Sequence, residues 1–96
     1  MVKYEFSTSP TSHVLSLDPM TRVKQVTIWG DAGDVTVSAA ANAHSPFEPV
    51  IDRATGEQLV VTGDKRTFNI VDYRIENLKL EATPTGTWYV SIETWG

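Results

Sequence analysis

The sequence contains no cysteine, so neither a disulfide framework nor a thiolate metal site can form. This absence fits a protein that folds in a reducing compartment. No apolar run reaches the length of a membrane span, and the N-terminal stretch "MVKYEFSTSP" lacks the apolar centre of a signal peptide. The sequence therefore predicts a protein with no membrane partner that is soluble and cytoplasmic when it is made.

Clusters of basic residues are also missing. The formal net charge is −4, and the adjacent basic pair Lys65-Arg66 follows directly on Asp64. Nucleic-acid binding normally requires a Lys/Arg surface that displaces phosphate counterions. We therefore expect no nucleic-acid partner.

Helical periodicity is absent, and apolar residues instead recur at every second position. In the run 34–39, for example, Val35 and Val37 alternate with Thr36 and Ser38, the pattern of a half-buried strand. Comparable runs predict strands at 2–6, 13–17, 23–29, 34–39, 47–51, 58–62, 67–71, 73–82 and 87–95.

Two of these runs carry an irregularity. Pro49 cannot donate a backbone hydrogen bond, so its run is predicted to be an edge strand or to contain a bulge. In 73–82 the apolar phase changes by one residue near Glu76-Asn77, which predicts a β-bulge.

The glycine-containing turns "GDAG", "RATG", "TGDK" and "TPTG" separate the runs. The chain has 96 residues, of which 41% are hydrophobic, and this is enough for one modest core. About eight short strands with regular turns predict a single all-β domain over residues 1–96. The expected architecture is an antiparallel β-sandwich, for which a jelly roll is one form, or a small barrel.

Residues that could support catalysis or metal binding are sparse. His13 and His44 have no His, Asp or Glu partner at a metal-binding spacing, so we expect structural or solvent-exposed roles for both. Asp31 and Asp34 superficially suggest a calcium loop, but the alternating ligands and terminal Glu are missing, which favours an ordinary turn. We expect no metal, no cofactor and no catalytic residue. An enzyme with carboxylates in a shallow cleft stays open as an alternative without a positive signal.

The three tryptophans fall into two groups. Trp88 shares the apolar phase of the last run and is predicted to lie in the core, whereas Tyr89 and Trp95 point the opposite way. Trp29 lies in the polar phase of its own run. A tryptophan outside the core can cover the end of a sandwich and donate its indole N–H to a turn carbonyl. It can also anchor a protein interface, or provide a stacking platform for a sugar ring.

Residues 22–96 resemble small bacteriophage virion proteins. The stretches that carry the resemblance are "VTIWGDAGDVTVSAA", "FEPVIDRATGEQLVVT", "YRIENLKLEA" and the terminal "TPTGTWYVSIETWG". Together they form a pattern of strands and turns and contain no set of invariant chemical residues. The first 20 residues have no such counterpart. They are interpreted either as an arm that adds a strand to a neighbouring subunit or as an ordinary strand of the same sandwich.

The resemblance implies a non-enzymatic structural role in the virion, as a capsid decoration (cement) protein or a small head or tail component. The implied partners are the major capsid protein or other virion subunits, and a homo-oligomer, with a trimer as the plausible case. Alternatives are a carbohydrate- or receptor-binding module of a tail or fibre, and an inhibitor or host-takeover protein. The residues expected at the interface are Trp29, Trp95, Tyr89, Tyr4 and Phe6.

Overall fold

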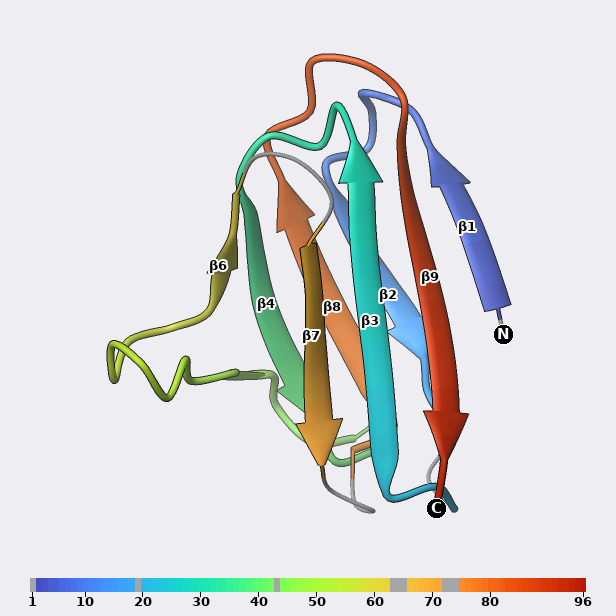
Figure 1. Ribbon diagram of the computed structural model, residues 1–96, viewed down its shortest axis with the longest axis vertical. Helices are drawn as coiled ribbons and strands as arrows, with labels where there is room; N and C mark the ends of the chain where they lie inside the picture. The colour runs from blue at the N-terminus through green and yellow to red at the C-terminus, as the bar shows by residue number, and fades with distance from the viewer. Residues whose placement is uncertain (1, 19, 43, 63–65, 72–74) are drawn as a thin grey trace.

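The computed structural model describes residues 2–18, 20–42, 44–62, 66–71 and 75–96. These residues form nine strands and no helix, and the strands build two antiparallel sheets packed against each other (Figure 1). The predicted all-β sandwich is therefore confirmed. The strands are β1 (Val2–Phe6), β2 (Ser12–Ser16), β3 (Val23–Gly30), β4 (Val35–Ala40), β5 (Glu48–Pro49), β6 (Val60–Val61), β7 (Arg66–Val71), β8 (Asn77–Ala82) and β9 (Trp88–Trp95).

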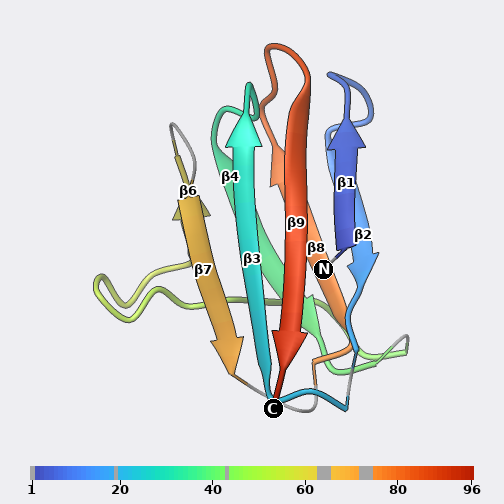
Figure 2. The same ribbon diagram turned by 45° about the vertical axis from the view of Figure 1, so that its right-hand side comes forward.

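The strand pairing is that of a jelly roll. One sheet has the order β1-β9-β3-β7 and the other the order β2-β8-β4-β5, with β6 also paired to β4. If β5 and β6 count as one interrupted strand, the first strand pairs with the last, the second with the last but one, and so on inward along the chain. This is a long hairpin rolled into two sheets. Figure 2 shows the four-stranded sheet in front, with β1 and β7 at its two edges.

The core lies between the sheets and follows the predicted alternation. In β3, Val26 and Ile28 are buried, whereas Gln25 and Thr27 on the opposite face are only half-buried. Trp88 is fully buried, as its phase in the last strand predicts. The buried apolar residues of the main cluster are Leu15, Leu17, Val26, Ile28, Ala32, Val35, Val37, Val61, Ile70, Leu78, Leu80, Ala82, Trp88, Val90 and Ile92.

Some details differ from the sequence-based predictions. The strand β8 begins at Asn77, so the phase change near Glu76-Asn77 marks the start of a strand rather than a bulge within one. Ile75 packs against the core from the segment that precedes β8. Residues 73 and 74 of the predicted run, and residues 63–65 of the "TGDK" turn, lie outside the described residues.

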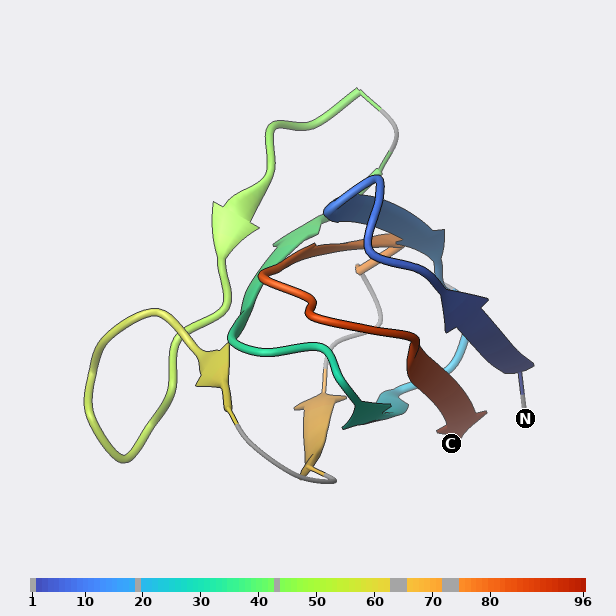
Figure 3. The same ribbon diagram turned by 90° about the horizontal axis from the view of Figure 1, so that it is seen from above.

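β5 and β6 both pair with β4 and run in the same direction. Between them the chain leaves the sheet as an excursion through residues 50–59, which is closed by the bridge Ile51↔Gln58 and by the hydrogen bond from Leu59 N to Val50 O. Figure 3 shows the excursion projecting from the side of the sandwich. Pro49 occupies the short edge strand β5, which agrees with the prediction from its missing N–H.

Aromatic rings close the edge of the sandwich formed by β1 and β2. The Phe6 ring on β1 stacks on the His13 ring on β2 with centroids 3.8 Å apart, and it also lies 4.9 Å from the ring of Trp88. The indole N–H of Trp88 donates a hydrogen bond to the Ser7 carbonyl at 3.2 Å. A hydrogen bond from an indole N–H to a turn carbonyl was one alternative for a tryptophan outside the core. In the structure, the core residue Trp88 makes this hydrogen bond.

The structure places Tyr4 and Phe6 inside the sandwich, although the sequence analysis grouped them with the interface residues. In the β1–β9 register Tyr4 lies opposite Val90 and Phe6 opposite Trp88, so both side chains face inward and are half-buried against the core. The physical reason is that β1 pairs along its length with the last strand of its own chain and therefore shares the inward phase of that strand.

Two tight turns meet at one end of the sandwich. Thr83 Oγ1 accepts a hydrogen bond from Asp34 N at 2.9 Å, and the Thr83 N–H lies within hydrogen-bond distance of the Ala32 and Asp34 carbonyls. Gly33 has φ +67°, and a Cβ atom added there would lie 2.2 Å from the Thr83 carbonyl oxygen. Only glycine satisfies both the backbone conformation and this close approach.

We expect Gly33→Ala to destabilise the fold more than Gly56→Ala. Gly56 also has positive φ (+74°), but nothing lies within 4 Å of an added Cβ atom. Gly56→Ala should therefore lower the free energy of unfolding by about 1 kcal/mol, because alanine disfavours a positive φ, with no added clash. The loss for Gly33→Ala should exceed this by at least about 1 kcal/mol because of the clash. Urea unfolding measures both, and equal losses would contradict the docking of the two turns.

We expect Phe6→Ala to lower the free energy of unfolding by about 2 kcal/mol, because it removes a half-buried ring between the sheets. Val2→Ala in the same strand is the matched control. Val2 is 53% exposed, so its truncation should change stability by no more than about 0.5 kcal/mol. If both variants unfolded like the parent chain, β1 would not be an integral strand of the sandwich.

Candidate functional site

The outer face of the four-stranded sheet brings together three of the five predicted interface residues. We call it the β3–β9 face. Alternation along each strand and the cross-strand registers fix its members in rows that run across the sheet. The rows are Val71, Val23 and Trp95; Asn69, Gln25 and Glu93; Thr67, Thr27, Ser91 and Lys3; and Trp29, Tyr89 and Glu5.

Trp29 and Tyr89 form a cross-strand pair at one end of this face. Their rings stack with centroids 5.4 Å apart and planes inclined by 17°. The Lys3 ammonium lies 5.7 Å from the centroid of the indole, a distance at which a cation is attracted to the ring face. Both rings are half-buried by these neighbours, so the pair is a preformed, ordered patch.

Trp95 belongs to a second apolar patch at the opposite end of the face. It lies directly across from Val23, which in turn lies across from Val71 on β7. Trp95 is 46% exposed and Val71 is 53% exposed. The strand register alone places these two valines beside Trp95, so alternation within single strands does not predict that they extend the patch.

The centre of the β3–β9 face is polar but carries few charges. The hydroxyls of Thr27 and Thr67 are 3.0 Å apart and hydrogen-bonded across the strands. Gln25 and Ser91 beside them are half-buried. An apolar patch at each end of a polar strip suits a protein interface, in which polar contacts fix the register and large side chains supply the affinity.

Trp29 and Trp95 lie too far apart to contact one small ligand together. They lie on neighbouring strands six positions apart in the register, and a strand rises about 3.3 Å per residue, so about 20 Å separates them. One sugar ring therefore cannot contact both. One face of the Trp29 indole already stacks on Tyr89, which leaves less of it for a sugar.

The outer face of the other sheet differs in character. The Lys79 ammonium lies 5.5 Å from the centroid of the Phe47 ring and 3.5 Å from a Glu81 carboxylate oxygen. Val14 is 56% exposed on this face. Charged side chains thus lie in the middle of this sheet, whereas the aromatic pair belongs to the β3–β9 face.

The titratable residues singled out in the sequence lie in three separate places: His13, His44, and the turn that holds Asp31 and Asp34. The His13 Nε2 atom is 3.0 Å from the Pro10 carbonyl, and the backbone N–H of His44 donates to the Asn42 side chain. Asp31 and Asp34 lie in the turn that docks on Thr83. Within the described residues, no three His, Asp or Glu side chains gather closely enough to hold a metal ion.

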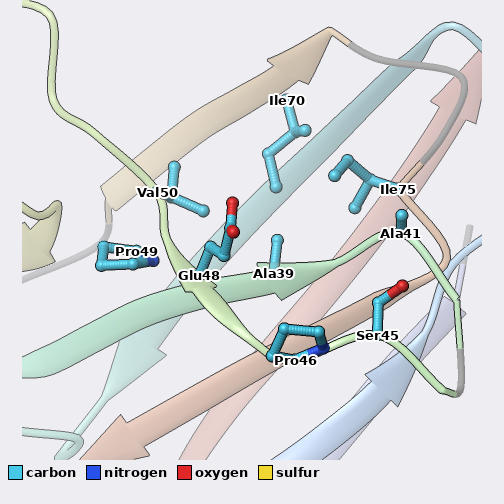
Figure 4. Close-up of a pocket in the computed structure, with 9 residues that line it drawn as sticks. All are labelled: Ala39, Ala41, Ser45, Pro46, Glu48, Pro49, Val50, Ile70 and Ile75. Atoms are coloured by element: carbon cyan, nitrogen blue, oxygen red, sulfur yellow. The ribbon is translucent and has the colours of Figure 1, made fainter.

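A pocket of about 490 Å³ opens between β7 and the β4–β5 edge. Figure 4 shows Ile70 on β7, Ile75, Ala39 on β4 and Val50 around this space, together with the Glu48 side chain. The walls are mostly aliphatic. Sequence reasoning missed this pocket because its residues come from four separate segments that only the rolled topology brings together.

Comparison of the chain with protein-family models, curated protein sequences and solved structures found no significant match. Among the described residues there is no helix long and apolar enough to span a membrane.

The stacking of Trp29 on Tyr89 can be measured with a double-mutant cycle on stability. Trp29→Ala, Tyr89→Ala and the double variant should show a coupling energy of about 0.5–1.5 kcal/mol, the usual value for an aromatic pair. Trp29→Ala paired with Val14→Ala is the control, and it should be additive because Val14 lies on the other sheet. Additivity of Trp29 and Tyr89 would show that the two rings do not stack.

Proposed function

We propose that this protein is a non-enzymatic structural component of a bacteriophage virion that binds and stabilises the capsid through its β3–β9 face. The observation that carries the proposal is the pair of apolar patches on one uncovered sheet face, Trp29 with Tyr89 and Trp95 with Val23. The resemblance of residues 22–96 to small virion proteins supplies the biological setting.

The tryptophans on this face suit interface anchors. Within the described part of the chain, Trp88 is the one tryptophan whose indole N–H makes a hydrogen bond inside the chain. The N–H groups of Trp29 and Trp95 can therefore donate to a partner's carbonyl while the rings supply apolar area, the combination that makes tryptophan common at binding hot spots.

The architecture supports the proposal by analogy. Jelly rolls occur in viral capsid proteins, and they also occur in lectins. A fold does not specify a function, so the analogy favours a virion role without separating capsid binding from glycan binding. The 20 Å spacing of the tryptophans and the internal stacking of Trp29 favour a broad protein surface as the partner.

Capsid stabilisation would then follow from mass action. Copies that bind the assembled shell, and not the dispersed subunits, lower the free energy of the shell. Association of the protein around a local symmetry axis, with a trimer as the expected form, would multiply weak contacts through avidity.

Co-sedimentation with phage heads that lack the protein tests the proposal. Trp29→Ala and Trp95→Ala should each weaken binding by about 30-fold, with a smaller effect on folding because neither side chain is in the core. Val14→Ala, at a site that is 56% exposed on the other sheet, should bind like the parent chain. Native mass spectrometry over a range of concentrations should show a closed oligomer in multiples of 10.6 kDa.

Three results would contradict the proposal. One is a change of tryptophan fluorescence on adding oligosaccharides together with no binding to heads, which would favour a glycan-binding module. The second is loss of thermal stability with unchanged binding in the tryptophan variants, which would make the rings structural. The third is binding that falls equally in Val14→Ala, which would move the contact to another face.

A further inference from the structure

Within the described residues, the edge strand β7 has a strand partner on one side only. It pairs with β3 on one side, and the four-stranded sheet ends with it on the other. In an antiparallel ladder every second residue of an edge strand directs its N–H and C=O away from the sheet. In the part of the chain that the structure describes, these outward groups of β7 have no backbone partner.

Hollows follow β7 along its whole length. One of about 250 Å³ is lined by Arg66, Thr67 and Phe68, and one of about 310 Å³ by Phe68, Asn69 and Val71. Ile70 lines the pocket of about 490 Å³ in Figure 4. The opposite walls come from the chain around the β5–β6 excursion: Val50, Ile51, Asp52, Arg53, Leu59, Val60 and Val61.

The edge at β1 is built differently. The space between β1 and β2 is filled by the stacked rings of Phe6 and His13, and β1 itself carries Lys3 and Glu5. Charged residues on an edge strand discourage pairing with another chain, as does proline, which occurs in β5 at Pro49. After Arg66, β7 has neither a charge nor a proline. Among the described strands, β7 therefore lacks both kinds of protection, as does the edge strand β2, and β7 borders the hollows.

We propose that β7 accepts an extended segment of a partner protein as an added antiparallel strand. The segment carries apolar side chains at every second position and an acidic residue near its C-terminal end. The backbone edge selects an extended chain. The apolar residues of the hollow walls, such as Leu59 and Phe68, suit the alternating apolar residues, although Asp52 lines the two smaller hollows as well. In antiparallel pairing the C-terminal end of the segment lies beside Arg66, at the start of β7, where a carboxylate has a complementary charge.

A single strand fits this place better than a second folded copy. The excursion between β5 and β6 projects on the same side of the sandwich (Figure 3), and its residues form the far wall of the hollows beside β7. A second copy would bring its own excursion to the same place, whereas an extended segment would lie between the excursion and β7. This inference concerns the backbone edge of β7, which adjoins the β3–β9 face through Thr67, Asn69 and Val71, and it does not rest on capsid binding.

The probe is a synthetic peptide that alternates threonine and valine and ends in glutamate, added at about 1 mM to the full-length, isotope-labelled chain. At that concentration a complex with a Kd of about 1 mM is about half-saturated. We expect NMR shifts and slowed hydrogen exchange at alternate amides of β7. A peptide of the same composition with its valines made contiguous is the sequence control and should leave β7 unchanged.

Three matched variants locate the site. Ile51→Lys and Val71→Lys place a charge in the hollow beside β7, and Val14→Lys places one on the other sheet; the three parent residues are 54%, 53% and 56% exposed. All three should fold. The first two should weaken peptide binding by about tenfold or more, because an ammonium in the hollow must be desolvated, whereas Val14→Lys should bind like the parent chain.

Several results would overturn the proposal. They are the absence of shifts at β7 with the peptide at 1 mM, equal loss of binding in all three variants, and shifts confined to β3 and β9. Protection of β7 that rises with protein concentration and needs no peptide would make a second copy the occupant, which also contradicts a partner segment.

Discussion

The stacking of rings between β1 and β2 is the interaction on which the shape of the sandwich depends. Phe6, His13 and Trp88 come from the first, second and last strands, and together they join the two sheets where the rolled hairpin begins and ends. Trp88 is fully buried there and has its one polar group satisfied by the Ser7 carbonyl. With this edge filled by aromatic rings, the modest core of a 96-residue chain leaves hollows at the opposite edge, beside β7.

The four-stranded sheet thus offers two surfaces with different chemistry. Its outer face presents side chains, with an aromatic pair at one end and Trp95 at the other. Its edge at β7 presents backbone N–H and C=O groups above hollows that both apolar and charged residues line. A side-chain surface recognises the shape and polarity of a folded partner, whereas a backbone edge recognises any extended chain and gains its selectivity from the pockets below. Val71 belongs to both surfaces, so an added strand would lie beside the patch around Trp95.

The orientation of some site residues follows from their own strand, whereas that of others depends on distant parts of the chain. Trp29, Tyr89 and Trp95 could be placed outside the core from alternation within their own strands. Alternation also places Phe6 in one phase with Tyr4, but only the pairing of β1 with β9, from the far end of the chain, shows that this phase faces the core. Lys24 is a similar case: it shares the phase of Val26, is fully buried, and its ammonium donates to the Thr21 carbonyl. A charge in an apolar phase can be buried only where the fold supplies such a partner.

Four features follow from local sequence alone: the period of two, the positions of the turns, the inward direction of Trp88 and the edge position of Pro49. They depend on backbone chemistry and on neighbours within a few residues. Which strands lie side by side depends instead on contacts between distant parts of the chain. This pairing put Val23 and Val71 next to Trp95, aligned Asp34 with Thr83, and gathered Ile70, Val50 and Ala39 around one pocket. Pairing between distant strands depends on how the whole chain buries its apolar faces at once, and no local pattern encodes that outcome.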